Sequence, residues 1–370
     1  MRQYMRFVAI GATSIAMAAA LAACGEAGGG DDDKDNDGGG GGGYTIGLLL
    51  PENATARYES FDRPYIEDKI KELCPDCDIK YSNADQDTNT QKQQFDALLT
   101  EGVDAIILDA VDASATASWV EDAQAEDVPV IAYDRLAQGP IAGYVSYDNV
   151  KVGELQAQTL LDSLGDQAEG ARVVMINGSP TDPNSGDFKQ GAHSVLDDTV
   201  DVVYEQDIDG WDAALANEKM TGAIESLGNG NDPGFDAVYV ANDGMAAGVI
   251  TALHSAGITD VPVGGQDAEV AGLQSILAGD QTFTIYKALR QEAETTAELT
   301  YRVLEGDDTG DLATSTVDSP TDEDIPARLF DPVAVTVDNI NDTVVADGFH
   351  TPEEICTGDY AAACQEAGIG

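Results

Sequence analysis

The strongest constraint on the fold of this chain is an alternation of short apolar runs with amphipathic stretches, which occurs twice. The first series of apolar runs comprises Tyr44–Leu50, Asp78–Tyr81, Ala105–Leu108, Val128–Tyr133 and Gly143–Ser146. The second series comprises Ala171–Asn177, Val200–Glu205, Ala237–Ala241, Val261–Gly264 and Phe283–Tyr286. Apolar runs of this length are typical of buried strands, and helical patterns between them indicate βαβ units. The sequence therefore predicts an α/β protein with two doubly wound parallel sheets.

The segments after residue 286 complete two predicted lobes. Residues 288–304 have the period of an amphipathic helix, and residues 306–326 are rich in Asp and Thr, which indicates a loop. Residues 333–337 and 343–345 are predicted to be late strands. A hinge of several chain crossings, with a cleft beside it, would join the lobes. The expected lobes are an N-terminal lobe of residues 44–147 with 287–325 and a C-terminal lobe of residues 148–286 with 326–370.

The charge of the chain excludes one class of partner. Lys and Arg number 18 against 68 Asp and Glu, which gives a formal net charge of −50. A phosphate backbone would be repelled by such a protein, so unassisted nucleic-acid binding is excluded. The carboxylates are spread along the chain, and this favours a surface adapted to strong salt. The alternative is an acidic exported protein that self-repulsion keeps soluble.

The amino terminus has the order of an export signal. Arg2 and Arg6 precede an apolar run over residues 7–20, which is too short to span a membrane. The segment closes on Leu-Ala-Ala-Cys at 21–24, which resembles a bacterial lipoprotein lipobox. We therefore expect a signal peptide over residues 1–23, lipid on Cys24, and a flexible Gly/Asp tether over residues 24–43. The protein would be held by that lipid at the outer face of the cell membrane.

The other thiols and the histidines indicate structure and not chemistry. Four Cys remain, an even number that suits an oxidising compartment. Cys-Pro-Asp-Cys at 74–77 could be a redox motif, but no thioredoxin-like pattern surrounds it. Two local disulfides are favoured, Cys74 with Cys77 and Cys356 with Cys364. The three His lack the spacing of zinc ligands, so neither a metal nor a cofactor is expected.

Polar side chains follow several of the predicted strands. They stand at 52–63, at 134–135, at 177–184, at 242–243 and at 266–267. Ligands of doubly wound sheets collect beyond these carboxyl ends. The side chains there are carboxylates, amides, guanidinium groups and aromatic rings, without His. This set suits a neutral polyol better than a reactive centre.

The same stretches resemble the bacterial D-xylose-binding proteins, sugar-binding subunits of ABC importers with the type I periplasmic-binding fold. The resemblance runs in the family's order from about residue 44 to residue 350. The segments that carry it include Val-Ile-Ala-Tyr-Asp-Arg at 130–135, Gly-Ser-Pro-Thr-Asp-Pro-Asn at 178–184, Asp-Gly-Trp at 209–211, Ala-Asn-Asp at 241–243, Gly-Gln-Asp-Ala at 265–268 and Thr-Ile-Tyr-Lys at 284–287, together with residues 144–157 and 342–350.

The resemblance implies a set of sugar ligands. Hydroxyl groups would be bound by Arg57, Asp134, Arg135, Asn184, Asn242, Asp267 and Lys287, with Tyr58 and Trp211 against the sugar's faces. Trp211 could instead be a core residue, and Lys287 a helix-end cation. The family usually has Trp where Tyr58 stands, and the segment 57–63 is one residue longer than expected. Glucose, arabinose or several aldoses therefore remain possible beside xylose.

The expected function is capture without chemistry. A monomeric lipoprotein would close on a monosaccharide, D-xylose or a related aldose, and deliver it to an ABC permease. A surface sensor that presents the sugar to a membrane receptor is the alternative. An enzyme is not expected, because a glycosidase needs an acid of raised pKa. Cations and hydroxyl-binding groups beside Asp134 and Asp267 would instead keep both carboxylates ionised.

Overall fold

The computed structural model describes residues 43–370 apart from Ala54 and Asn231. The predicted signal peptide, the lipidation site Cys24 and nearly all of the tether lie outside the described residues. None of the helices in the described ranges is long and apolar enough to cross a bilayer.

The first lobe is built on one mixed sheet, which in the described chain has the order β10-β11-β5-β4-β3-β1-β2. All neighbouring strands run parallel except β10, which is antiparallel to β11. The strands are β1 (Thr45–Leu50), β2 (Asp78–Asn83), β3 (Ala105–Leu108), β4 (Val130–Tyr133), β5 (Gly143–Tyr147), β10 (Ser315–Val317) and β11 (Ile325–Phe330). The helices are α1 (Arg63–Leu73), α2 (Thr88–Glu101), α3 (Ala117–Ala125) and α9 (Leu289–Glu305). Helices cover the sheet on both sides, which is why β3 and β4 are buried along their whole length.

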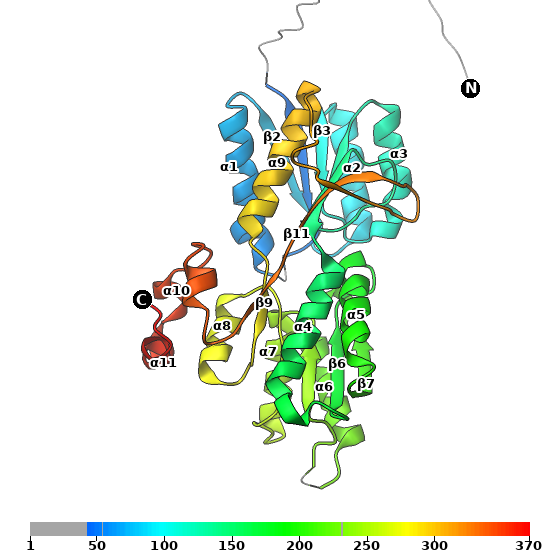
Figure 1. The fold of residues 1–370 in the computed structure, drawn as a ribbon. Coiled ribbons are helices and arrows are strands. Elements are labelled where there is room, and N and C mark those ends of the chain that lie inside the picture. Colours follow the sequence, from blue (N-terminus) through cyan, green and yellow to red (C-terminus); the bar gives the residue numbers. More distant parts are fainter. Residues whose placement is uncertain (1–42, 54, 231) are drawn as a thin grey trace, which may run out of the picture. The chain divides into compact units, whose positions relative to one another are not determined.

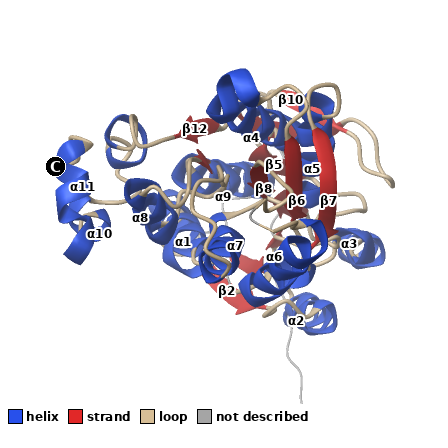
Figure 2. Ribbon diagram, turned by 90° about the horizontal axis from the view of Figure 1, so that it is seen from below, coloured by secondary structure: helices blue, strands red, loops and turns tan. Residues whose placement is uncertain are grey.

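The second lobe has parallel strands in the order β7-β6-β8, and β9 pairs with β12 in antiparallel fashion beside them. The strands are β6 (Arg172–Asn177), β7 (Asp201–Asp207), β8 (Ala237–Val240), β9 (Thr284–Tyr286) and β12 (Val333–Val335). The helices are α4 (Asn149–Leu164), α5 (Pro183–Leu196), α6 (Ala213–Leu227), α7 (Asp243–Ser255), α8 (Val270–Ala278), α10 (Pro352–Ile355) and α11 (Ala361–Glu366). Figure 2 shows α4 and α5 on one side of the parallel strands and α6 and α7 on the other.

Short helical turns complete the described chain. The 3₁₀ turns are η2 (Ala113–Ala115), η3 (Gly165–Gln167), η4 (Asp209–Trp211) and η6 (Gly358–Tyr360). The π-helices are η1 (Tyr58–Asp62) and η5 (Asn341–Val345).

The chain passes between the lobes three times within the described residues: from β5 to α4, from β9 to α9 and from β11 to β12 (Figure 1). The two-lobed α/β fold predicted from the alternation is confirmed. The predicted boundary at 325/326 is wrong, because residues 325–330 form β11, which pairs with β5 of the first lobe. The last crossing therefore lies after Phe330.

Three local predictions are also wrong. Residues 343–345 are not a strand but part of η5, because Val344 packs into a buried cluster with Ile340 and Phe349. The predicted loop 306–326 contains β10 and the start of β11. β11 has no continuous apolar run, and it forms a strand because it pairs with β5. Residues 261–264 contribute only one bridge, between Val263 and Val238.

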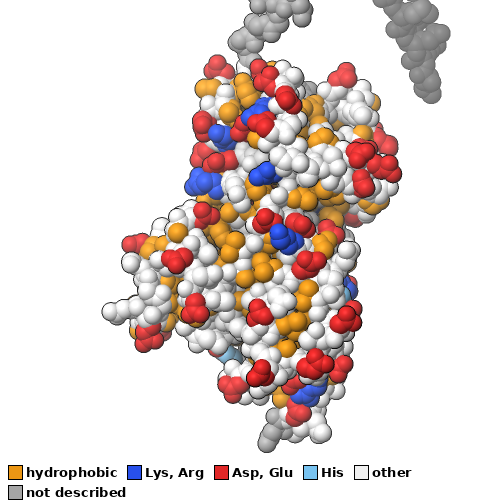
Figure 3. All heavy atoms as spheres, in the orientation of Figure 1, with side chains coloured by type: hydrophobic (Ala, Val, Ile, Leu, Met, Phe, Trp, Pro, Cys, Tyr) orange, Lys and Arg blue, Asp and Glu red, His pale blue; other side chains and the backbone are white. Residues whose placement is uncertain are grey.

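Two further features concern the surface and the cross-links. Cys74 is bonded to Cys77 and Cys356 to Cys364, the pairing that the sequence favours. On the face drawn in Figure 3, Asp and Glu side chains are spread over both lobes, whereas Lys and Arg are few. Dispersed carboxylates of this kind keep a protein surface hydrated and self-repelling.

Candidate functional site

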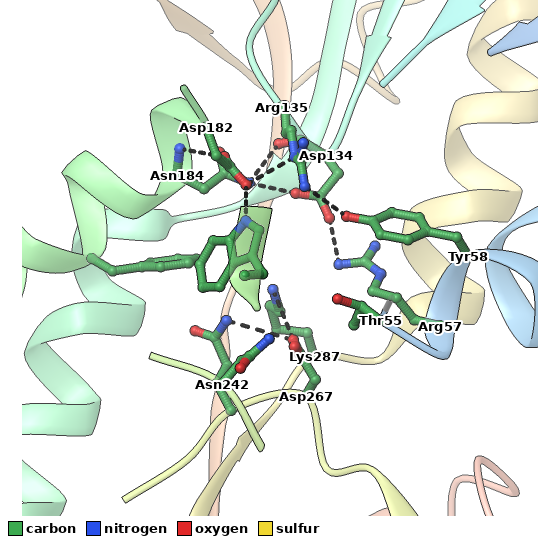
Figure 4. A pocket seen from close by; sticks show the side chains of 13 residues that line it. Thr55, Arg57, Tyr58, Asp134, Arg135, Asp182, Asn184, Asn242, Asp267 and Lys287 are labelled. Atoms are coloured by element: carbon green, nitrogen blue, oxygen red, sulfur yellow. Dashed lines mark hydrogen bonds and ion pairs between the residues drawn. The ribbon is translucent and has the colours of Figure 1, made fainter. Parts of the chain in front are cut away.

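A pocket with an empty volume of about 310 Å³ lies between the lobes, at the carboxyl ends of strands from both (Figure 4). All nine residues predicted to bind a ligand line it. The first lobe supplies Arg57, Tyr58, Asp134 and Arg135, the second supplies Asn184, Trp211, Asn242 and Asp267, and Lys287 stands on the second crossing. The prediction did not include Thr55, Asp182, Phe188 and Gln266, which also line the pocket.

Arg57 brings a buried positive charge to the first-lobe wall. Its guanidinium pairs with Asp134 and makes two hydrogen bonds to Asp62, from Nε at 2.8 Å and from Nη2 at 3.0 Å. Glu292 of α9 lies 3.4 Å from Nη2. Burial alone would raise the pKa of Asp134, but the charges of Arg57 and Lys287 bring it below its usual value. Asp134 is therefore a carboxylate, and it can accept hydrogen bonds from hydroxyl groups.

Asp134 is fixed by its backbone as well as by its charge partners. It directly follows β4 with a φ of 57°, the left-handed region that few residues other than Gly, Asn and Asp adopt readily. Its carbonyl accepts hydrogen bonds from Ser146 Oγ at 2.7 Å and Tyr144 Oη at 2.8 Å. Across the cleft, Asn184 Nδ2 donates to the Asp134 carboxylate. Asn149 Nδ2 in turn donates to Asn184 Oδ1 at 2.9 Å, so the amide orientation is determined.

Asp182 contacts both Trp211 of its own lobe and Arg135 of the first lobe. Its Oδ2 lies 2.9 Å from Arg135 Nε and accepts a hydrogen bond from Trp211 Nε1 at 3.2 Å. The other oxygen caps α5, since it accepts from the Asn184 amide at 2.9 Å. Burial raises the pKa of Asp182 although Arg135 opposes this. A sequence signal for Asp182 exists, because Asp182 stands in the polar range 177–184 that follows a predicted strand.

Tyr58 and Trp211 present rings to the pocket from opposite lobes. Arg135 Nη2 donates to Tyr58 Oη at 3.2 Å, which holds the phenol against the first-lobe wall. Trp211 packs on the backbone of Gly178, where an added Cβ would lie 2.0 Å from the indole ring. Gly178 is therefore required for the indole to lie where it does. Trp211 belongs to the buried hydrophobic cluster of the second lobe, as the alternative of a core residue expects, and its ring also lines the pocket wall.

The opposite wall is held by α7 and the second crossing. Asn242 caps α7 by accepting from the Met245 amide at 2.9 Å, and this fixes the orientation of its side chain. Lys287 Nζ lies 3.3 Å from Asp267 Oδ1 and 5.5 Å from the centroid of the Phe188 ring. Lys287 is therefore a buried pocket residue and not an exposed helix-end cation.

The site offers many hydrogen-bonding groups and no nucleophile with an adjacent base. Among the described residues, no three His, Cys, Asp or Glu side chains are grouped to hold a metal ion. Carboxylates, guanidinium groups, an ammonium group and amides converge on a small volume, flanked by ring faces. Such a lining can form hydrogen bonds with all the hydroxyl groups of a compact molecule that carries many of them.

Comparisons with known proteins agree with this geometry. A model of the periplasmic binding protein domain matches residues 46–308. The chain is 33% identical over 317 residues to the D-xylose-binding periplasmic protein of Escherichia coli, a match that covers 84% of this chain and 92% of the relative. It is 30% identical over 331 residues to the multiple sugar-binding periplasmic receptor of Rhizobium radiobacter, covering 84% and 92%. The chain therefore belongs to the type I sugar-binding family of periplasmic binding proteins.

Solved structures share the fold. An ABC transporter solute-binding protein of Clostridium phytofermentans with bound β-D-glucose superposes with a TM-score of 0.74 at 23% identity, over 84% of this chain and 99% of the other. A carbohydrate transporter solute-binding protein of Chloroflexus aurantiacus in complex with D-glucose gives 0.73 at 24% identity, over 84% and 97%.

Glu269, beside the pocket residue Asp267, makes stability depend on pH. Burial and then the charge of Asp267 raise the Glu269 pKa from 4.5 to about 7. The folded state thus binds more protons than the unfolded state between these values, so the free energy of unfolding falls as pH rises through this window. We expect Glu269→Gln to remove that fall. The free energy of unfolding of the variant, relative to that of the wild type, should therefore rise by about 1–3 kcal/mol between about pH 5 and 8. Urea denaturation of both proteins at both pH values measures the free energy of unfolding. An equal change with pH in the wild type and in Glu269→Gln would contradict the prediction.

Proposed function

We propose that this protein captures a monosaccharide, D-xylose or a related aldose, between its lobes outside the cytoplasm and delivers it to an ABC importer. The observation that carries the proposal is the convergence of polar side chains from both lobes on one pocket. Capture by both lobes stabilises the closed form, because only that form makes both sets of contacts. The importer's membrane subunits would then receive the closed, loaded protein.

The chemistry of the walls supports an aldose. Asp134, Asp182 and Asp267 accept hydrogen bonds from hydroxyl groups, while Arg57 and Lys287 donate them. The rings of Tyr58 and Trp211 offer apolar contact to the C–H faces of a sugar. A wrong epimer leaves a buried polar group unpaired, at about 1–3 kcal/mol each. The names of the relatives from Escherichia coli and Rhizobium radiobacter favour a xylose-type or broader aldose range.

A binding role is favoured over an enzymatic one. The relatives are named as binding proteins and receptors. The Asp134 carboxyl, whose pKa is lowered by Arg57 and Lys287 despite burial, is a poor general acid at neutral pH.

Calorimetry of the mature protein without its tether tests the proposal. Xylose, glucose, galactose, arabinose and ribose would be titrated at low and high salt. We expect at least one of them to bind with micromolar or tighter affinity, about −8 kcal/mol. Absence of heat for all five, from protein shown to be folded, would end the sugar assignment. Release of product from a chromogenic glycoside would favour an enzyme instead.

Attachment through Cys24 is a separate part of the proposal, supported by the Leu-Ala-Ala-Cys order after an apolar run. Two or more acyl chains on one Cys hold a protein firmly at a membrane. Cys24→Ser should move the protein from the membrane fraction to the medium, while Cys74→Ser should not. Mass spectrometry of the amino terminus would show whether lipid is present on the wild-type chain.

A sensor that presents sugar to a membrane receptor is the second candidate, favoured by the name of the Rhizobium radiobacter relative, a multiple sugar-binding periplasmic receptor. Transport and sensing use the same pocket. Cross-linking in cells with sugar present separates them, because a permease subunit would be captured in one case and a signalling receptor in the other.

A further inference from the structure

A second cavity adjoins the sugar pocket. It has an empty volume of about 800 Å³ and shares Arg57 and Asp267 with the first pocket, so these two side chains stand at the junction. The first lobe contributes Ser60 and Phe61 to its lining, and the second contributes residues 269–271 at the start of α8. The cavity is therefore lined by residues of both lobes, as the sugar pocket is.

The wall of this cavity carries aromatic rings. Phe61 packs on Phe349 with ring centroids 4.4 Å apart and on His350 at 5.3 Å. Val270 and Ala271 add apolar surface from α8, and Ala271 is exposed. Ser60, Glu269 and Glu354 supply hydroxyl and carboxyl groups. An apolar face with a few polar groups around it is the arrangement that a sugar ring fits, since it has C–H faces and hydroxyl edges.

Local backbone structure explains how one segment serves both cavities. The segment 57–63, one residue longer than the resemblance leads one to expect, contains the π-helix η1 over Tyr58–Asp62. An extra residue in a helix is accommodated by a π-turn, and such turns are frequent at functional sites. Tyr58 of η1 lines the sugar pocket, whereas Ser60 and Phe61 of the same turn line the second cavity.

We propose that the second cavity is a subsite for the second ring of a disaccharide whose first ring occupies the sugar pocket. This inference rests on the proposed sugar-binding function and widens its substrate class from monosaccharides to short saccharides. Phe61 packs against one face of the second ring, and the groups of Ser60 and Glu269 exchange hydrogen bonds with its hydroxyls. Arg57 and Asp267, at the junction, contact both rings.

The test compares xylobiose, cellobiose and maltose with xylose and glucose by calorimetry. We expect the best disaccharide to bind at least as tightly as its own monosaccharide. Ala271→Trp fills the cavity from an exposed helix position and should weaken disaccharide binding at least tenfold, with monosaccharide binding changed less than twofold. Ala278→Trp on the same helix is also exposed, lines neither cavity and should change neither affinity.

The outcomes separate the two proposals. If monosaccharides bind and all three disaccharides do not, the subsite is wrong and the monosaccharide function stands. If a disaccharide binds equally well to the wild type and to Ala271→Trp, its second ring lies elsewhere and the subsite is also wrong. If no saccharide binds to folded protein, the proposed function itself fails. Phe61→Ala gives a second measurement, with a selective loss for disaccharides expected.

Discussion

Replacement of Asp134 by Asn is expected to weaken binding of the preferred aldose about a hundredfold, or about 2.8 kcal/mol. The carboxylate lies in the pocket wall, pairs with Arg57 and accepts from Asn184 of the other lobe. The amide removes the negative charge that pairs with Arg57 and turns one of the two acceptor oxygens into a donor, so one of the partners of the carboxylate, Arg57, Asn184 or a sugar hydroxyl, loses its acceptor. Buried charge-assisted hydrogen bonds are the costly ones to break.

The fold should tolerate this change. Asn adopts the left-handed backbone conformation of position 134 more readily than most residues. Calorimetry gives the affinity, and urea denaturation of the same protein shows whether the fold is kept. Asp122→Asn, at an exposed position of α3 in the same lobe, is the matched control and should bind as the wild type does. Binding by Asp134→Asn within threefold of the wild type would refute the role of this carboxylate.

Replacement of Trp211 by Ala is expected to weaken binding of the preferred aldose about fiftyfold to a hundredfold, a loss similar to that expected for Asp134→Asn. The indole forms one wall of the pocket and donates to Asp182, so Ala removes the apolar face and leaves the Asp182 carboxylate with one donor fewer. Large aromatic side chains at the centre of a site carry much of its binding energy. Trp211→Phe keeps a ring and loses the donor, so about a tenfold loss is expected.

The other Trp of the chain provides the control. Trp119 is buried in the first lobe against Phe95, with ring centroids 6.0 Å apart, and does not line the pocket. Trp119→Ala should lower the free energy of unfolding by a few kcal/mol, as large-to-small core changes do. It should leave the affinity of the folded protein unchanged. A loss of affinity as large as that of Trp211→Ala would mean that general destabilisation explains both.

Most of the strands could be predicted from the sequence because a strand that helices cover on both faces is apolar along its length. β3 and β4 are of this kind. β11 could not be predicted in this way, since its residues are only partly apolar and it forms by pairing with β5, which is far away in the sequence. The opposite error occurred at residues 343–345, where a β-branched run forms η5 because Val344 is buried against Ile340 and Phe349.

The nine candidate ligand residues could be named because the sequence resembles a known family, and all of them except Trp211 and Lys287 also lie in the polar ranges that follow predicted strands. Asp182 was missed because an Asp before a proline at a helix start has a sufficient structural explanation as a cap. Only the structure shows that its second oxygen also joins Arg135 to Trp211.

The sequence by itself determined the number of lobes and the polar character of the cleft, because burial on both faces and ligand contacts at strand ends impose local residue patterns. Tertiary structure decided where the chain last crosses between the lobes and which carboxylate each cation pairs with. It also decided that a second cavity lies beside the first. These features depend on contacts between residues far apart in the chain, and no local pattern encodes them.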